Sequence, residues 1–100
     1  MTNREVCEAF AEGKKEARNL QGSLYIHAGI LFSYGEHWPL ALWFHEFALV
    51  NCDNYTKSDG KVSRTTAHHR SLVLNALLKE RVPVIKTTLA DLQARARTMR

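Results

Sequence analysis

The five histidines are the side chains of this chain best suited to acid–base chemistry or to holding a metal ion. A zinc site requires ligands in close pairs, such as H-x-x-x-H, or cysteines spaced two apart. His68 and His69 are adjacent, and adjacent residues of a helix point in different directions, which disfavours one shared metal. Cys7 and Cys52 lie far apart without a C-x-x-C pairing, so we interpret them as reduced, buried small side chains. The sequence therefore predicts no metal and no cofactor.

A second candidate site lies at the predicted start of a helix, in the segment 63–70. Free backbone N–H groups, threonine hydroxyls, arginines and histidines together suit a phosphate group or an acidic side chain. The plainer interpretation is that Thr65 or Thr66 only caps the helix. A cluster of His37 with one of the two histidines of this segment is a further alternative.

Aromatic side chains form a third candidate, concentrated in the middle of the chain. Tyr25, Tyr34, Trp38 and Trp43 could give one sheet face a stacking surface for bases, as in proteins that bind single strands. The same residues would equally suit a core, or an exposed protein interface rimmed by charge. We expect part of this set to be exposed, because the predicted helices cover only one face of the sheet.

The elements that position these residues begin with a predicted first helix, Asn3–Gln21. Thr2 and Glu5 have the spacing of a capping box that opens this helix. Gly22 is placed as the residue that ends it, and Gly13 weakens its interior.

Three predicted strands follow. In the first, apolar residues alternate with a period of two over 23–33, with a bulge or bend at Gly29. The other two are Leu40–Phe44 and Phe47–Cys52, joined by a tight reversal at 45–46. These strands indicate a short antiparallel meander.

The last part of the chain is predicted to be helical. A polar loop over 53–64 leads to a second helix, which ends near Arg81 because a proline follows two residues later. A link at Val84–Thr87 leads to a third helix capped by Thr88. The order α-β-β-β-α-α predicts an α+β fold, a three-stranded antiparallel sheet with helices on one face, in one domain spanning 1–100.

Composition and charge are those of an ordinary globular protein, with 45% hydrophobic and 24% charged residues and a formal net charge of +4. The basic excess lies mainly in 57–100 and would attract a polyanion only modestly. The charged N-terminus has no signal-peptide pattern, and the apolar run Pro39–Phe44 is too short to cross a bilayer. We therefore expect a cytoplasmic protein with no membrane partner.

Motifs of the common enzyme classes are absent from the sequence: there is no G-x-S-x-G, phosphate-binding loop, catalytic carboxylate pair or Cys–His pairing. A metal-independent ribonuclease needs only a base, an acid and a cation. The histidines, Tyr55, Lys57 and Arg64 could fill those roles. Because this inventory fits many basic proteins, a toxin-like ribonuclease is only the third hypothesis.

Three short patterns occur in order along the middle half of the chain: Ser-Tyr-Gly-x-His at 33–37, Asn-x-Asp-x-Tyr at 51–55 and Thr-Thr-x-His at 65–68. On these patterns the chain resembles small uncharacterised proteins of bacteriophages and mobile elements, with an apparent insertion at 57–64. Small phage proteins without catalytic motifs often bind and block host machinery, and they include anti-CRISPR inhibitors. The resemblance implies that context and no particular activity.

The leading hypothesis is a non-enzymatic, anti-CRISPR-like inhibitor that binds a host protein or nucleoprotein complex, with a homodimer as a further option. The runner-up is a basic nucleic-acid-binding module, because the α-β-β-β-α order resembles the double-stranded-RNA-binding fold. The residues predicted to form the binding surface are Tyr34, His37, Trp38, Trp43, Tyr55, Arg64, Thr65, Thr66, His68, His69 and Arg70.

Overall fold

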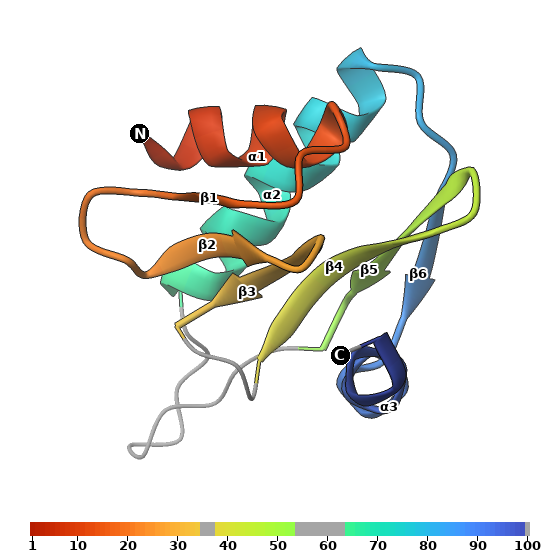
Figure 1. The fold of residues 1–100 in the computed structure, drawn as a ribbon. Helices are drawn as coiled ribbons and strands as arrows, with labels where there is room; N and C mark the ends of the chain where they lie inside the picture. The colour runs from red at the N-terminus through yellow and green to blue at the C-terminus, as the bar shows by residue number, and fades with distance from the viewer. Residues whose placement is uncertain (35–37, 54–63, 100) are drawn as a thin grey trace.

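The computed structural model describes residues 1–34, 38–53 and 64–99 (Figure 1). Along the chain the elements are α1 (Asn3–Ala11), β1 (Ala17–Arg18), β2 (Leu24–His27), β3 (Ile30–Ser33), β4 (Pro39–Phe44), β5 (Phe47–Asn51), α2 (Arg64–Lys79), β6 (Val84–Thr87) and α3 (Leu89–Met99). The fold is α+β, but the order is α-β-β-β-β-β-α-β-α, so the predicted α-β-β-β-α-α order is wrong.

Within the described residues the sheet has six strands, in the order β1-β2-β3-β4-β5-β6. The first five are neighbours in sequence and pair antiparallel, while β6 pairs parallel to β5. A parallel neighbour requires a crossover connection, and α2 supplies it between β5 and β6. The predicted three-stranded antiparallel sheet is therefore wrong: the sheet is larger and mixed.

Helices cover both faces of the sheet, whereas the sequence predicted one covered face. α1 and α2 pack against each other on one face, and α3 lies on the other (Figure 1). Two buried clusters mirror this division. The first joins α1 and α2 to the sheet through residues such as Phe10, Leu31 and Leu77, and the second joins α3 to it through Phe32, Leu42 and Leu92.

The start of α1 is fixed by the capping box read from the sequence. The Thr2 hydroxyl accepts a hydrogen bond from the Glu5 N–H at 3.2 Å, and the Glu5 carboxylate accepts one from the Thr2 N–H at 2.9 Å. Two otherwise unpaired donors of the first turn are thereby satisfied, so this prediction is confirmed.

The end of α1 comes much earlier than predicted. Gly13 has a φ of 85°, in the left-handed region, and its N–H donates to the Phe10 carbonyl. The Lys14 N–H donates to the Ala9 carbonyl. These two bonds are a Schellman motif, which ends a helix with glycine just after it. The predicted longer helix is wrong because Gly13, rather than Gly22, occupies that position.

The long strand predicted over 23–33 is instead the hairpin β2–β3. Ala28 and Gly29 form its two-residue turn, with φ of 53° and 80°. Positive φ at both central residues matches the right-handed twist of the flanking strands. The reversal predicted at 45–46 is confirmed between β4 and β5.

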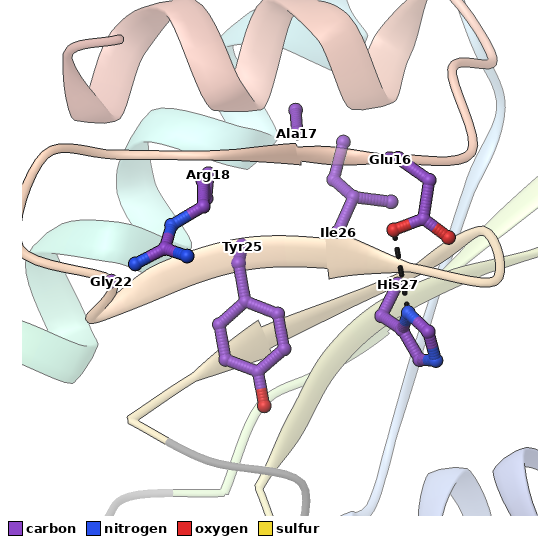
Figure 2. Close-up of a pocket in the computed structure, with 7 residues that line it drawn as sticks. All are labelled: Glu16, Ala17, Arg18, Gly22, Tyr25, Ile26 and His27. Carbon is purple, nitrogen blue, oxygen red and sulfur yellow. Dashed lines mark hydrogen bonds and ion pairs between the residues drawn. The ribbon is translucent and has the colours of Figure 1, made fainter.

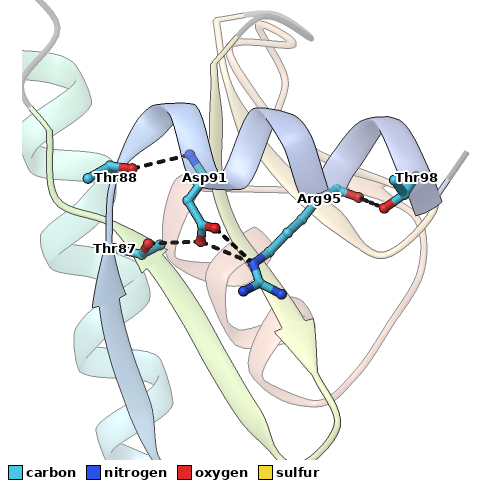
Figure 3. A network of polar contacts seen from close by, with 5 residues as sticks. All are labelled: Thr87, Thr88, Asp91, Arg95 and Thr98. Atoms are coloured by element: carbon cyan, nitrogen blue, oxygen red, sulfur yellow. Dashed lines mark hydrogen bonds and ion pairs between the residues drawn. The ribbon is translucent and has the colours of Figure 1, made fainter.

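The segment predicted to be a link, Val84–Thr87, is the edge strand β6. Thr65 and Thr66 lie inside α2, which begins at Arg64, so neither is its cap. The predicted cap of α3 is confirmed, since the Asp91 N–H donates to the Thr88 hydroxyl at 3.2 Å (Figure 3).

Among the described residues, no helix is both long enough and apolar enough to span a bilayer.

Candidate functional site

A buried polar cluster joins the end of β3 to the first turns of α2. The Ser33 hydroxyl lies 2.9 Å from Nδ1 of His69 and 3.5 Å from the Thr66 hydroxyl. Ser33 is 1% exposed, Thr66 2% and His69 0%. We refer to these three residues, with Tyr34, as the Ser33–His69 junction. It ties the end of β3 to the first turns of α2 by hydrogen bonds.

The local sequence explains why these side chains meet. Along β3, Leu31 points into the core beneath α1 and α2, and Ser33 shares that side because strand residues alternate. On α2 the buried residues are Thr66, His69, Val73, Ala76 and Leu77, which recur at helical spacing. The apolar stripe of α2 therefore continues backwards into a threonine and a histidine.

His69 is held in its neutral form. Burial, with a smaller contribution from the nearby charge of His68, lowers the pKa of His69 from 6.5 to about 4. Its Nε2 atom is buried and has no hydrogen-bond partner among the described residues. A serine and a neutral histidine are the parts of a nucleophile–base pair, but Ser33 is only 1% exposed. The geometry therefore favours a structural role.

Tyr34 is the exposed member of the junction. The residue is 54% exposed, and its ring stacks on the His69 ring with centroids 5.8 Å apart and planes at 28°. Its backbone has a φ of 67°, which is rare for a residue that is not glycine, and its N–H donates to the Ser23 carbonyl at 2.7 Å. Strain of this kind is concentrated at functional positions, where the surrounding structure enforces it.

A second polar group lies where β5 ends. The Asp53 carboxylate accepts a hydrogen bond from the Leu89 N–H at 2.8 Å, which satisfies a donor at the start of α3. The Asn51 side chain accepts one from the Asp53 N–H at 2.8 Å, and its amide donates to the Pro39 carbonyl at 3.2 Å. The Arg70 guanidinium donates to the Asp53 carbonyl at 3.3 Å. These contacts join β5 to α2 and α3.

The two tryptophans predicted for the binding surface do not form an exposed sheet face. Trp38 is 8% exposed. Trp43 packs on Phe10, with ring centroids 5.9 Å apart, and its indole N–H donates to the Phe10 carbonyl at 2.9 Å. Trp43 is thus partly buried against the core beneath α1, where its indole N–H finds an acceptor.

The remaining predicted residues divide by burial. Arg64, Thr65 and His68 are exposed on α2, Arg70 is half-buried, and Thr66 and His69 are buried. His37, Tyr55 and Lys57 lie outside the described residues, so the expected His37 cluster and the ribonuclease roles of Tyr55 and Lys57 stay predictions. Ser33 was not among the predicted binding residues, although the Ser-Tyr-Gly pattern includes it.

Among the described residues, no three histidine, cysteine or acidic side chains gather as they would around a metal ion. Cys7 is buried, and burial raises the pKa of its thiol to about 12. Cys52 is half-buried, and its thiol donates to the Val50 carbonyl at 3.8 Å. Both thiols are free, but only Cys7 is buried, so the predicted burial holds for Cys7 and not for Cys52.

No protein-family model matches the chain, and comparison with curated proteins and with solved structures likewise finds no match.

Proposed function

We propose that this protein is a small protein-binding module that acts without catalysis, and that Tyr34 anchors its partner. The observation that carries the proposal is the exposed Tyr34 ring, held at a φ of 67° and supported from beneath by buried His69. Tyrosine supplies a large contact area at low entropic cost, which is why it is enriched at protein interfaces. A strained backbone is retained when the position serves a purpose besides stability.

The surroundings of Tyr34 suit a partner surface with acidic character. Arg64 and His68 are exposed on the first turns of α2, the helix that supplies His69. The described first turn of α2 has no acidic residue, so the positive end of the helix dipole is not offset there. An exposed cation such as Arg64 steers association and selects partners more than it adds affinity.

The resemblance to small phage and mobile-element proteins supports a host complex as the partner. On this proposal the protein acts in the cytoplasm of a host cell and blocks a protein or nucleoprotein assembly, as anti-CRISPR inhibitors do. The contact between the Ser33 and Thr66 hydroxyls joins the first resembling pattern to the third, and the second pattern begins at the last residue of β5. On this proposal, the three patterns on which the resemblance rests maintain the surface that presents Tyr34.

The substitution Tyr34→Gly separates binding from stability. Left-handed backbone costs a residue other than glycine roughly 1–2 kcal/mol, and an aromatic pair contributes roughly 0.5–1.5 kcal/mol. These effects oppose each other, so the free energy of unfolding should change by less than about 1 kcal/mol. Binding should fall at least about tenfold, as for an interface anchor. Urea unfolding and affinity capture from nuclease-treated bacterial lysate, followed by titration of the captured complex, measure the two effects.

Phe47→Ala is the matched control, because Phe47 is an exposed aromatic residue, 41% exposed, at the start of β5. We expect this variant to retain the partner. Undiminished binding by Tyr34→Gly, or loss of binding only in Phe47→Ala, would exclude Tyr34 as the anchor. Retention of nucleic acid alone would replace the proposal with the nucleic-acid hypothesis. That hypothesis no longer has its topological support, since the chain does not follow the α-β-β-β-α order.

A further inference from the structure

At its β1–β2 end, the face of the sheet that carries α3 is not covered by any helix of the described residues. α3 packs over β4 and β5 and does not extend across the first two strands. A hollow of about 390 Å³ lies there, on a different face of the sheet from the Ser33–His69 junction. The hollow is faced by the side chains of Arg18, Tyr25 and His27. The side chains of Ala17 and Ile26 point to the opposite face, toward the core beneath α1 (Figure 2). We refer to this site as the Arg18 hollow.

One end of the hollow carries an available cation. Arg18 is opposite Tyr25 in the β1–β2 register, and it is exposed. No hydrogen bond or ion pair joins its guanidinium to another described residue. The guanidinium lies against Gly22, where a Cβ would stand 3.2 Å from Nη2, so glycine leaves the space it occupies. A planar guanidinium in this state suits bidentate contact with a phosphate.

The other end carries a carboxylate with remaining capacity to accept hydrogen bonds. Glu16 accepts from the Ala28 N–H at 3.2 Å and lies 3.3 Å from Nδ1 of His27 (Figure 2). The Ala28 and His27 contacts lower the pKa of Glu16, so it is ionised. An ionised carboxylate has about four acceptor positions, of which these contacts use two. Glu16 and Arg18 are two residues apart on an extended chain, so their Cα atoms lie about 7 Å apart.

The Tyr25 ring stands between these two ends. It is half-buried and packs on Phe32, with ring centroids 5.3 Å apart, which fixes its orientation. Figure 2 shows the ring projecting from β2 between Arg18 and His27. A fixed aromatic ring at the side of an open hollow provides a platform for a planar, apolar group.

We propose that the Arg18 hollow binds a nucleotide whose base carries an exocyclic amine. Its phosphate contacts Arg18, its base lies along Tyr25, and its amine donates to Glu16. A simple carboxylate or inorganic phosphate would contact only the Arg18 guanidinium. A nucleotide would contact the guanidinium, the Tyr25 ring and the Glu16 carboxylate. Carboxylates read cytosine through its amine in the same manner. The nucleotide is either free or one unit of a single strand, since both present the same groups. This site is independent of the Tyr34 surface.

Titration of the ¹⁵N-labelled protein with adenosine, cytidine and uridine monophosphates tests the proposal, with inorganic phosphate as a further probe. Adenosine and cytidine monophosphates should shift the amide signals of residues 16–27 in a saturable manner, and the other two probes should bind more weakly. Arg18→Gln should weaken binding about tenfold or more, because it removes a charge-assisted contact. Arg4→Gln is the matched control, because Arg4 is an exposed arginine on α1, across the sheet.

Saturable binding that Arg18→Gln abolishes and Arg4→Gln leaves intact would support the site. Equal affinity for inorganic phosphate or uridine monophosphate would overturn the nucleotide assignment, and so would an unchanged affinity in Arg18→Gln. A parallel titration with short adenine-containing single strands identifies the source. Tighter binding of the strand indicates a strand unit, and tighter binding of the monophosphate indicates a free nucleotide. Each of these two results supports the proposal.

Discussion

The Ser33–His69 junction and the Arg18 hollow are two polar clusters on different faces of one sheet, and each contains a histidine. In the junction, Ser33 and His69 are enclosed, and one short hydrogen bond joins them. In the hollow, the side chains of His27 and Glu16 are 55% and 65% exposed. The polar contacts of the two clusters are thus similar in length, but those of the junction are buried in the protein and that of the hollow is exposed to water.

The comparison shows that burial decides what a polar contact contributes. An enclosed polar group that loses its partner bears the full cost of desolvation, whereas water replaces the partner of an exposed one. The junction therefore contributes to stability and to the position of Tyr34. The polar contacts of the hollow contribute little to the free energy of unfolding. Arg18 and Glu16 are therefore available for a ligand.

The largest effect is expected from His69→Ala. This substitution removes an enclosed ring and leaves the Ser33 hydroxyl without its partner, so the free energy of unfolding should fall by about 4 kcal/mol. His27→Ala removes the same side chain from the exposed cluster and should cost less than about 0.5 kcal/mol. Urea unfolding followed by circular dichroism measures both. Equal losses in the two variants would show that burial does not separate the clusters.

A smaller effect is expected from pH. The folded state holds the pKa of His69 at about 4, below its ordinary 6.5, so the unfolded chain takes up the proton first. The contribution of neutral His69 should be complete above pH 6.5 and should fall by up to about 3 kcal/mol as the pH drops to about 4. Unfolding free energies measured across this range provide the test. His69→Gln should remove this part of the pH dependence, and an unchanged profile would contradict the assignment.

The smallest effect is expected from Glu16→Gln. This substitution removes the charge that faces His27 but keeps an oxygen to accept from the Ala28 N–H. Because solvent screens the pair, stability should stay close to that of the unchanged protein, and high salt should erase any difference. Thermal unfolding at low and high salt measures it. A large loss that salt does not reduce would mean that the hollow, like the junction, is part of the folded core.

Local features were predicted well where the nearby residues alone decide the structure. The Thr2–Glu5 capping box, the reversal at 45–46 and the Thr88 cap of α3 all formed as expected. Each involves residues at most a few positions apart, so side chain and backbone find the same partner in any context. The end of α1 was missed although its signal, Gly13, was present, because a second glycine offered a competing end.

The arrangement of the candidate site was much less predictable. The sequence indicated Tyr34, His69 and the start of α2 as a binding surface, but it did not indicate that Ser33 meets His69. It also placed Trp43 in the binding surface, whereas the structure packs this residue, partly buried, against Phe10. A pattern of period two or 3.6 shows which residues share a face, but it does not show which other element that face will meet.

By itself, the sequence determined an α+β chain with one well-defined first cap, a central hydrophobic segment and free cysteines. Only the tertiary structure decided that Val84–Thr87 becomes a strand parallel to β5, and that α3 crosses to the other face. Four residues with two apolar side chains do not form a strand alone. They do so beside β5, because α2 returns the chain there and the sheet edge supplies the hydrogen-bond partners. Long-range pairing of this kind depends on the whole chain, so no local pattern specifies it.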